Sequence, residues 1–194
     1  MNTKTRLLIK IAQRRVKPGT GSAYAIAAHK KDMEILHFIT TNFMLIGGHA
    51  TALYMPQRQT LDFDILVKDE DELKIEAEFL DRGATITSSL TIGGKSYLLD
   101  GQSIDAIACS QTWFDEAYTQ AVEAWGVKVI PLPYLVLLKM QASRMQDLAD
   151  CSRMLGLADN LTIHKIEKVF LEYAPNDLED LNSLIELGKL ENSQ

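Results

Sequence analysis

The sequence has little cysteine and no long apolar run, and each shortage excludes a class of protein. Its 194 residues include two cysteines, Cys109 and Cys151, which lack metal-ligand spacing and cannot build a disulfide framework. Sparse cysteine is typical of a reducing compartment, so we expect a cytoplasmic protein. No apolar run approaches the ~20 residues that a spanning helix needs, so we expect no membrane partner. Arg14, Arg15 and Lys17 interrupt the apolar region that a signal peptide would require.

Acidic residues are missing from the first 31 positions. This segment holds eight of the 20 basic residues, so the rest of the chain holds 12 basic residues and all 26 acids, a net charge of −14. We predict that residues 1–30 form a basic N-terminal arm or helix, and two interpretations of its charge stay open. The arm can bind RNA phosphates, or it can pack on the acidic body of its own or a neighbouring subunit.

A short apolar strand followed by two glycines is the first half of the pattern that organises the chain. The strand is the apolar run in residues 43–46, and Gly47 and Gly48 follow it directly. The next residues, 49–55, have helical spacing, and Pro56 ends that helix because proline cannot continue the hydrogen-bond ladder. The sequence therefore predicts a tight turn from strand to helix.

Two aspartates at the start of the next predicted strand, residues 61–67, form the second half of the pattern. Asp62 and Asp64 stand two positions apart, so in a strand both side chains point to the same face. Close carboxylates repel unless a cation neutralises them. Mg²⁺, or Mn²⁺ in its place, is the usual cation for an all-oxygen site, so we expect such an ion here.

The two halves together resemble the signature of the nucleotidyltransferase superfamily, the DNA polymerase β-like enzymes. In this chain the Gly-Gly pair is followed, after thirteen residues, by Asp62-x-Asp64. Within the superfamily, the motif GGxAxAL…R-x-T-x-D-x-D is most similar to that of AbiEii-type toxins and related bacterial nucleotidyltransferases. The resemblance implies an α/β (α+β) fold, with a mixed-sheet nucleotidyltransferase core over residues 31–132 and a C-terminal helical bundle over residues 133–194.

The resemblance also implies a reaction and its partners. The expected reaction moves a nucleoside monophosphate from a nucleoside triphosphate (NTP) to a hydroxyl of an RNA or protein acceptor. A cognate toxin or antitoxin is the expected protein partner. Two alternatives stay open: a small-molecule adenylyltransferase of the antibiotic-modifying kind, and a non-catalytic module that binds nucleotide or RNA.

Asp105 is the candidate for the third carboxylate that the resemblance demands. It lies among apolar residues in a predicted strand, residues 103–109, where an unpaired charge is costly. By resemblance, Asp62 and Asp64 hold the metal, and Asp105 is both an acceptor-side metal ligand and the general base. The alternative for Asp105 is a strand-end carboxylate that accepts a hydrogen bond from a loop amide.

Five further residues are the expected NTP contacts. The resemblance implies that Gly47 and Gly48 let the phosphates approach the backbone closely, near the amide of His49. The same histidine stands where we expect a small residue, so it either touches phosphate or caps the helix. Arg58 and Lys139 are the candidate cations for the triphosphate or for the leaving group.

Lys139 also belongs to a charged set in the predicted C-terminal helices. It shares one helical face with Asp147 and Asp150 if that helix is unbroken. The set resembles the Lys…Lys-Asp-x-x-Asp region of AbiEii-type proteins, although Gln146 stands in place of the second lysine. The alternative is a solvated face with pairs inside the helix.

The remaining pattern predicts helices and strands in alternation, then helices alone. Gly93-Gly94-Lys95-Ser96 is not a phosphate-binding loop, because Ser89 replaces its first glycine and a strand, not a helix, follows. The other expected elements are helices over 5–16, 23–42, 68–82, 112–125, 134–143, 146–155, 163–173 and 176–190, a hairpin over 84–99, and a strand over 127–130.

Overall fold

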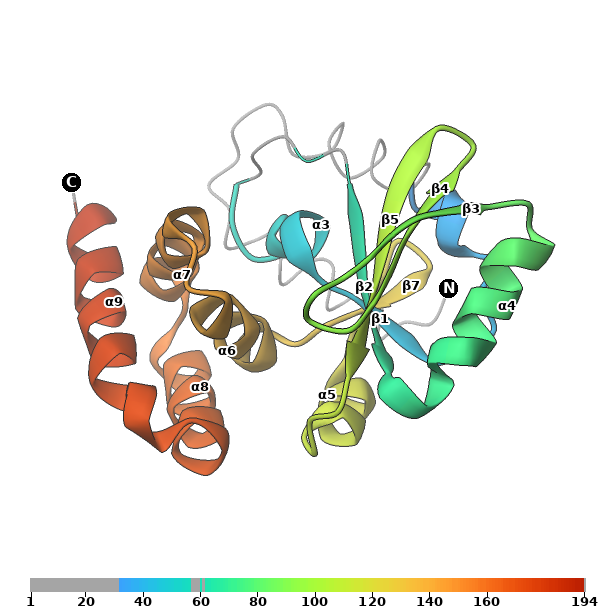
Figure 1. The fold of residues 1–194 in the computed structure, drawn as a ribbon. Coiled ribbons are helices and arrows are strands. Elements are labelled where there is room, and N and C mark those ends of the chain that lie inside the picture. Colours follow the sequence, from blue (N-terminus) through green and yellow to red (C-terminus); the bar gives the residue numbers. More distant parts are fainter. Residues whose placement is uncertain (1–31, 57–59, 61, 194) are drawn as a thin grey trace. The chain divides into compact units, whose positions relative to one another are not determined.

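The computed structural model describes residues 32–56, 60 and 62–193, which divide into two compact units (Figure 1). The described parts of 1–50 and 58–130 form the core unit, and those of 51–57 and 131–194 form the C-terminal unit. The predicted basic arm, the predicted helix over 5–16 and Arg58 lie outside the described residues.

Within these residues, the core unit is built on one mixed sheet. Its strands are β1 (Phe43–Leu45), β2 (Phe63–Lys68), β3 (Thr85–Ser89), β4 (Gly94–Leu99), β5 (Gln102–Cys109), β6 (Val122–Ala124) and β7 (Val127–Val129). They lie in the order β3-β4-β5-β2-β1-β7-β6. The pairs β2–β5 and β1–β7 are parallel, and the other neighbours are antiparallel. This arrangement confirms the predicted α/β fold with a mixed sheet.

Short helices connect the strands, and one of them covers a face of the sheet. They are η1 (Met33–Leu36), α3 (Gly47–Thr51), η2 (Asp69–Asp71), α4 (Glu72–Asp81) and α5 (Phe114–Gln120). α4 packs on the sheet through Phe79, whose ring stacks on Tyr97 of β4 with centroids 4.2 Å apart. Ile65 and Ile104 of the two central strands are fully buried. The alternation of apolar residues in β2 and β5 thus forms the core.

Three predicted helices are shorter than expected. The one predicted over 49–55 is α3, which ends at Thr51 and so before Pro56. Two more lie elsewhere in the core unit. The helix predicted over 23–42 continues, in its described part, only to the end of η1. The helix predicted over 112–125 ends at Gln120, because Val122–Ala124 pair with β7 as strand β6. In both places tertiary contacts override the local helical spacing.

A carboxylate on α4 explains why no helix continues through residues 40 and 41. Glu78 accepts hydrogen bonds from the backbone N–H groups of Thr40 (2.8 Å) and Thr41 (3.0 Å). It also accepts from both threonine hydroxyls, at 2.5 Å and 2.9 Å. The turn before β1 is therefore fastened to α4. Burial alone would raise the pKa of Glu78, but these hydrogen bonds outweigh it and lower the pKa.

The C-terminal unit is a set of helices, as predicted. The helices are α6 (Leu132–Ala142), α7 (Met145–Leu157), α8 (Asn160–Tyr173), η3 (Pro175–Asp177) and α9 (Leu178–Glu191). α7 and α9 cross at Gly156 and Gly188, where a Cβ on Gly156 would lie 2.2 Å from the carbonyl oxygen of Gly188. Only glycine lets the two backbones touch in this way. In the described chain, no helix is long and apolar enough to cross a membrane.

Both cysteines are buried and unbridged, one in each unit. Cys109 lies at the end of β5, and Cys151 lies on α7. Burial raises the pKa of both thiols, that of Cys151 to about 12. These cysteines therefore pack as small apolar side chains.

We predict that Glu78→Gln destabilises the protein by about 1–3 kcal/mol, because the amide faces backbone donors that the carboxylate now satisfies. Since the pKa of Glu78 is lowered by folding, its contribution is present above the unfolded value of ~4.3 and is lost as pH falls through the folded value. Urea unfolding between pH 3 and 7 measures both effects. Asp81→Asn, a neutralised exposed carboxylate on the same helix, is the control and should change stability by less than ~0.5 kcal/mol.

Candidate functional site

Asp64 and Asp105 are neighbours across the two central parallel strands. They are register partners in the pairing of β2 with β5, so both side chains point to the same face of the sheet. Neighbouring strands lie about 4.8 Å apart, which brings the two carboxylates close together. Both residues are only partly buried. The structure therefore brings together two of the three predicted acidic site residues.

The carboxylate of Asp64 lies directly against the backbone of Gly47. The strand β1 reaches this point beside β2, and the N–H of Ile46 donates to the carbonyl oxygen of Asp64 at 2.9 Å. A Cβ added to Gly47 would lie 1.8 Å from Asp64 Oδ2. Gly47 also has φ +62°, in the left-handed region. The glycine turn and the Asp64 carboxylate therefore form one geometric unit.

Thr60 occupies the equivalent place beside the second glycine. A Cβ on Gly48 would lie 2.6 Å from the Thr60 hydroxyl oxygen, so this threonine packs on the start of α3. The sequence interpretation assigned no role to Thr60. The sequence nonetheless marked this residue, because Thr60 is the threonine of the R-x-T-x-D-x-D motif that ends in Asp64.

Asp62 lies just outside the strand that was expected to include it. β2 begins at Phe63, not at residue 61, and Asp62 is an exposed residue directly before it. Among the residues described, no group of three His, Cys, Asp or Glu side chains is arranged to hold a metal ion. The described residues thus show the Asp64–Asp105 pair, and the role of Asp62 stays a prediction. Two carboxylates still fit Mg²⁺, which commonly takes one or two and completes its shell with water and phosphate oxygens.

His49 is a core residue rather than an exposed phosphate contact. Its side chain is buried, with 4% exposed, and its ring stacks on Phe63 with centroids 4.5 Å apart and an interplanar angle of 9°. The ring therefore joins α3 to the start of β2, and only the backbone of His49 remains a candidate for the site.

Ser96 extends the row of polar side chains beyond Asp105. It is the register partner of Asp105 in the pairing of β4 with β5, so Ser96, Asp105 and Asp64 share one face. Lys95 points to the opposite face and pairs with Glu76 of α4. The predicted strand after Gly93-Gly94 is confirmed, and with it the conclusion that this segment is not a phosphate-binding loop.

Lys139 lies in a buried cluster of charges within the C-terminal unit. Its ammonium donates to Asp147 and Asp150, each at 2.9 Å, and its side chain is 6% exposed. Arg144 donates to Asp147 at 2.6 Å, and Gln146 donates to Asp150 at 3.0 Å. A contact between Lys139 and nucleotide phosphates would require these ion pairs to open.

The cluster forms across a turn and not along an unbroken helix. α6 ends at Ala142, Ser143 adopts φ +54°, and α7 starts at Met145. The break agrees with the separate helices predicted over 134–143 and 146–155, so the condition of an unbroken helix is not met. The alternative of a solvated face is wrong, because Lys139, Asp147 and Asp150 are buried. Burial would raise the pKa of Asp147, but the hydrogen bonds from Lys139 and Arg144 lower it.

Comparison with known proteins finds nucleotidyltransferases at low sequence identity. No protein-family profile and no curated protein matches the sequence. A proposed nucleotidyltransferase from Helicobacter pylori has a TM-score of 0.49 and 13% identity, covering 86% of this chain and 94% of its own. ANT(2″)-Ia, solved with adenylyl-2″-tobramycin, has a TM-score of 0.45 and 15% identity, covering 84% of this chain and 94% of its own. A proposed nucleotidyltransferase from Thermotoga maritima has a TM-score of 0.43 and 16% identity, covering 64% of this chain and 88% of its own. These identities transfer no residue role to this chain.

We predict that Gly47→Ala destabilises the protein more than Gly83→Ala does. Both glycines have positive φ, which costs alanine about 1–2 kcal/mol, but only Gly47 has a carboxylate in the space of the new methyl group. The clash adds about 1–3 kcal/mol. Chemical denaturation of the two variants measures the difference, and Gly83, with nothing within 4 Å, isolates the backbone cost.

A second substitution tests the contact itself. Asp64→Ala removes the carboxylate that the Gly47→Ala methyl would meet, so the double variant should recover ~1 kcal/mol or more of the summed loss. Strict additivity of the two changes would contradict the close approach of Asp64 to Gly47.

We predict that Lys139→Met destabilises the C-terminal unit by about 3–5 kcal/mol, because two buried carboxylates lose their cation. Arg144→Met is the matched control, since it removes a cation that contacts Asp147 but is 78% exposed, and it should cost less than ~1 kcal/mol. Adding Asp147→Asn and Asp150→Asn to Lys139→Met should restore part of the loss. Equal effects of the two methionine variants in urea unfolding would contradict a stabilising role for the buried cluster.

Proposed function

We propose that this protein is a Mg²⁺-dependent nucleotidyltransferase, which moves a nucleoside monophosphate from an NTP to a hydroxyl of an RNA or protein acceptor. The observation that carries the proposal is the row formed by Asp64 and Asp105, with the Gly47 backbone against the Asp64 carboxylate. The resemblance of the Gly-Gly and Asp-x-Asp pattern to nucleotidyltransferases supports the same conclusion from the sequence.

The glycine turn and the aspartate row divide the site into two sides. Gly47 and Gly48 have no side chains to keep phosphates from the backbone, so the triphosphate lies on the Asp64 side of the row. Asp105 is one strand further from the turn, so the acceptor hydroxyl approaches on that side. Asp62, exposed before β2, and Arg58 are the further candidates for contact with the metal-bound triphosphate.

Within this arrangement each residue has a stated chemical task. Asp105 accepts the proton of the acceptor hydroxyl, whose oxygen forms a bond to the α-phosphorus of the NTP. The bond between the α-phosphorus and the bridging oxygen breaks, and pyrophosphate leaves. Asp64 and Asp105 supply the oxygen ligands for Mg²⁺, with Mn²⁺ as an alternative. Mg²⁺ supplies charge neutralisation of the phosphate oxygens when it is bound.

The acceptor class follows from the sequence resemblance, which is to AbiEii-type proteins and so favours a macromolecule and a toxin–antitoxin pair. A small-molecule adenylyltransferase is the second enzymatic candidate. Asp64 and Asp105 are both retained and aligned, which favours an enzyme over a non-catalytic nucleotide-binding module.

We predict that Asp64→Asn and Asp105→Asn each reduce nucleotide transfer by at least ~10²-fold, because each removes a metal-ligand charge. Incubation with each labelled NTP and either total cell RNA, total protein or a panel of aminoglycosides measures transfer and identifies the acceptor class. Asp81→Asn, which neutralises an exposed carboxylate on α4, is the control and should leave transfer unchanged.

Binding and stability separate the possible outcomes. Calorimetry should show NTP binding with Mg²⁺ and much weaker binding with a chelator, and Asp64→Asn should unfold at an equal or higher temperature because carboxylate repulsion falls. Equal NTP affinity with and without Mg²⁺ would overturn the metal site. Metal-dependent binding without transfer to any acceptor would instead favour the non-catalytic module.

A further inference from the structure

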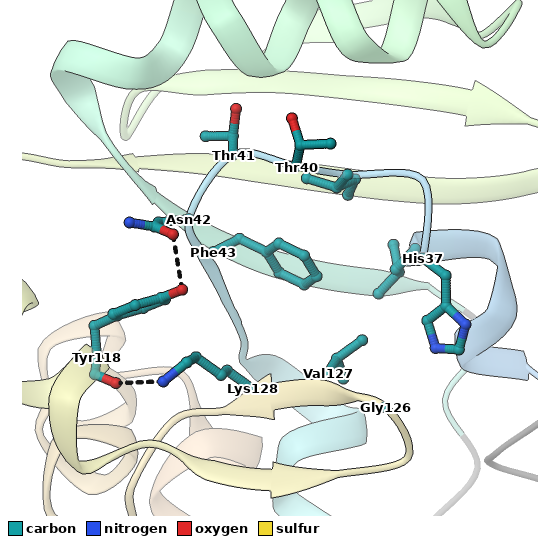
Figure 2. Close-up of a pocket in the computed structure, with 11 residues that line it drawn as sticks. His37, Thr40, Thr41, Asn42, Phe43, Tyr118, Gly126, Val127 and Lys128 are labelled. Carbon is teal, nitrogen blue, oxygen red and sulfur yellow. Dashed lines mark hydrogen bonds between the residues drawn. The ribbon is translucent and has the colours of Figure 1, made fainter.

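A hollow of about 240 Å³ lies in the core unit, where β1 begins (Figure 2). The glycine turn follows the opposite end of this strand, so the hollow is separate from the Asp64–Asp105 row. The segment before β1, the helix α5 and the strand β7 contribute its walls. The side chains that matter for its chemistry are His37, Asn42, Phe43, Tyr118, Val127 and Lys128.

The ammonium group of Lys128 is held in place at this hollow. It lies 4.3 Å from the centroid of the Tyr118 ring and donates to the Tyr118 carbonyl oxygen at 3.2 Å. The Tyr118 hydroxyl in turn donates to Asn42 Oδ1 at 2.8 Å (Figure 2). Lys128 keeps two further protons to donate. A charged hydrogen-bond donor is therefore fixed at the hollow.

The charge around the hollow is opposite to that of the rest of the chain. None of the lining residues is acidic, although residues 32–194 carry a net charge of −14. Lys128 forms no ion pair with any described residue, and its register partner Glu123 on β6 lies beyond salt-bridge distance. The nearby Glu78 carboxylate is satisfied by Thr40 and Thr41. An ordered ammonium without a counter-ion favours an anionic ligand.

Size and shape restrict that ligand further. The volume lies below the ~300–1,000 Å³ of ordinary small-molecule sites, which excludes a nucleotide and favours a fragment-sized molecule. Phe43 and Val127 supply an apolar wall between the polar groups (Figure 2). His37, whose Nε2 is 3.3 Å from the Trp125 carbonyl oxygen, closes the other side.

We propose that this hollow binds a small organic monocarboxylate. The carboxylate accepts hydrogen bonds from Lys128, and the short apolar or aromatic body of the ligand packs on Phe43 and Val127. The site is independent of the proposed nucleotide site, because the two lie at opposite ends of β1 and share no residue.

Benzoate is the probe, and its neutral analogue benzamide is the matched control ligand. The full chain is titrated with benzoate at constant ionic strength, and binding is followed by NMR of the backbone amides. The chemical shifts of Asn42, Gly126 and Lys128 should change and saturate with a Kd of ~1 mM. Benzamide should bind at least ~10-fold more weakly, because it lacks the charge. Inorganic phosphate should also bind more weakly, because it lacks the apolar body.

Substitutions complete the test. Lys128→Met should weaken benzoate binding at least ~10-fold, Lys128→Arg should retain it, and Lys74→Met, on the exposed surface of α4, should not change it. If Lys128→Met does not fold, Lys128→Gln, which keeps a polar side chain without the charge, should weaken binding in the same direction. Unsaturable shifts, equal binding of benzamide, or equal affinity in the Lys128→Met and Lys74→Met variants would overturn the proposal. NTP binding does not enter any of these measurements, so they stand apart from the proposed function.

Discussion

The contact between the Asp64 carboxylate and the Gly47 backbone is the constraint on which the core unit depends. It requires β1 to end beside the start of β2, which the hydrogen bond from Ile46 to Asp64 secures. It requires a residue without a side chain at position 47, in a backbone conformation that glycine favours. The parallel pairing with β5 then brings Asp105 to the same face. One close approach thus determines the turn, the strand register and the position of the acidic pair.

The sequence could predict those features whose signal is local. Apolar alternation identified β2 and β5, glycines marked the hairpin before β4, and helical spacing identified the four long C-terminal helices. The pairing of Asp64 with Asp105 was accessible too, because neighbouring strands of the expected fold carry them. The early end of α5 could not be predicted, since Val122–Ala124 become a strand only by pairing with β7. Pairing between distant segments has no local signal.

Two of the candidate site residues show a second limit of the sequence. His49 and Lys139 are polar residues that function-based reasoning directs toward phosphates, yet both side chains are buried. The ring of His49 stacks on Phe63, and the ammonium of Lys139 is neutralised by Asp147 and Asp150. A buried polar group is costly unless it is paired, so such residues reveal their role only when their partners are known. The sequence did predict a break between residues 143 and 146, but not that it folds Asp147 and Asp150 back onto Lys139.

The burial of both cysteines has a consequence for chemistry on this protein. Burial raises the pKa of Cys151 to about 12 and that of Cys109 above its ordinary value, so both side chains are held as thiols at neutral pH. Because the thiolate is the reactive species and both side chains are buried, we expect the folded chain to react slowly with alkylating and maleimide reagents. A single cysteine introduced at an exposed position would then react selectively, without removal of either native residue. The two native thiols would in turn report unfolding, since their reactivity rises when their shielding is lost.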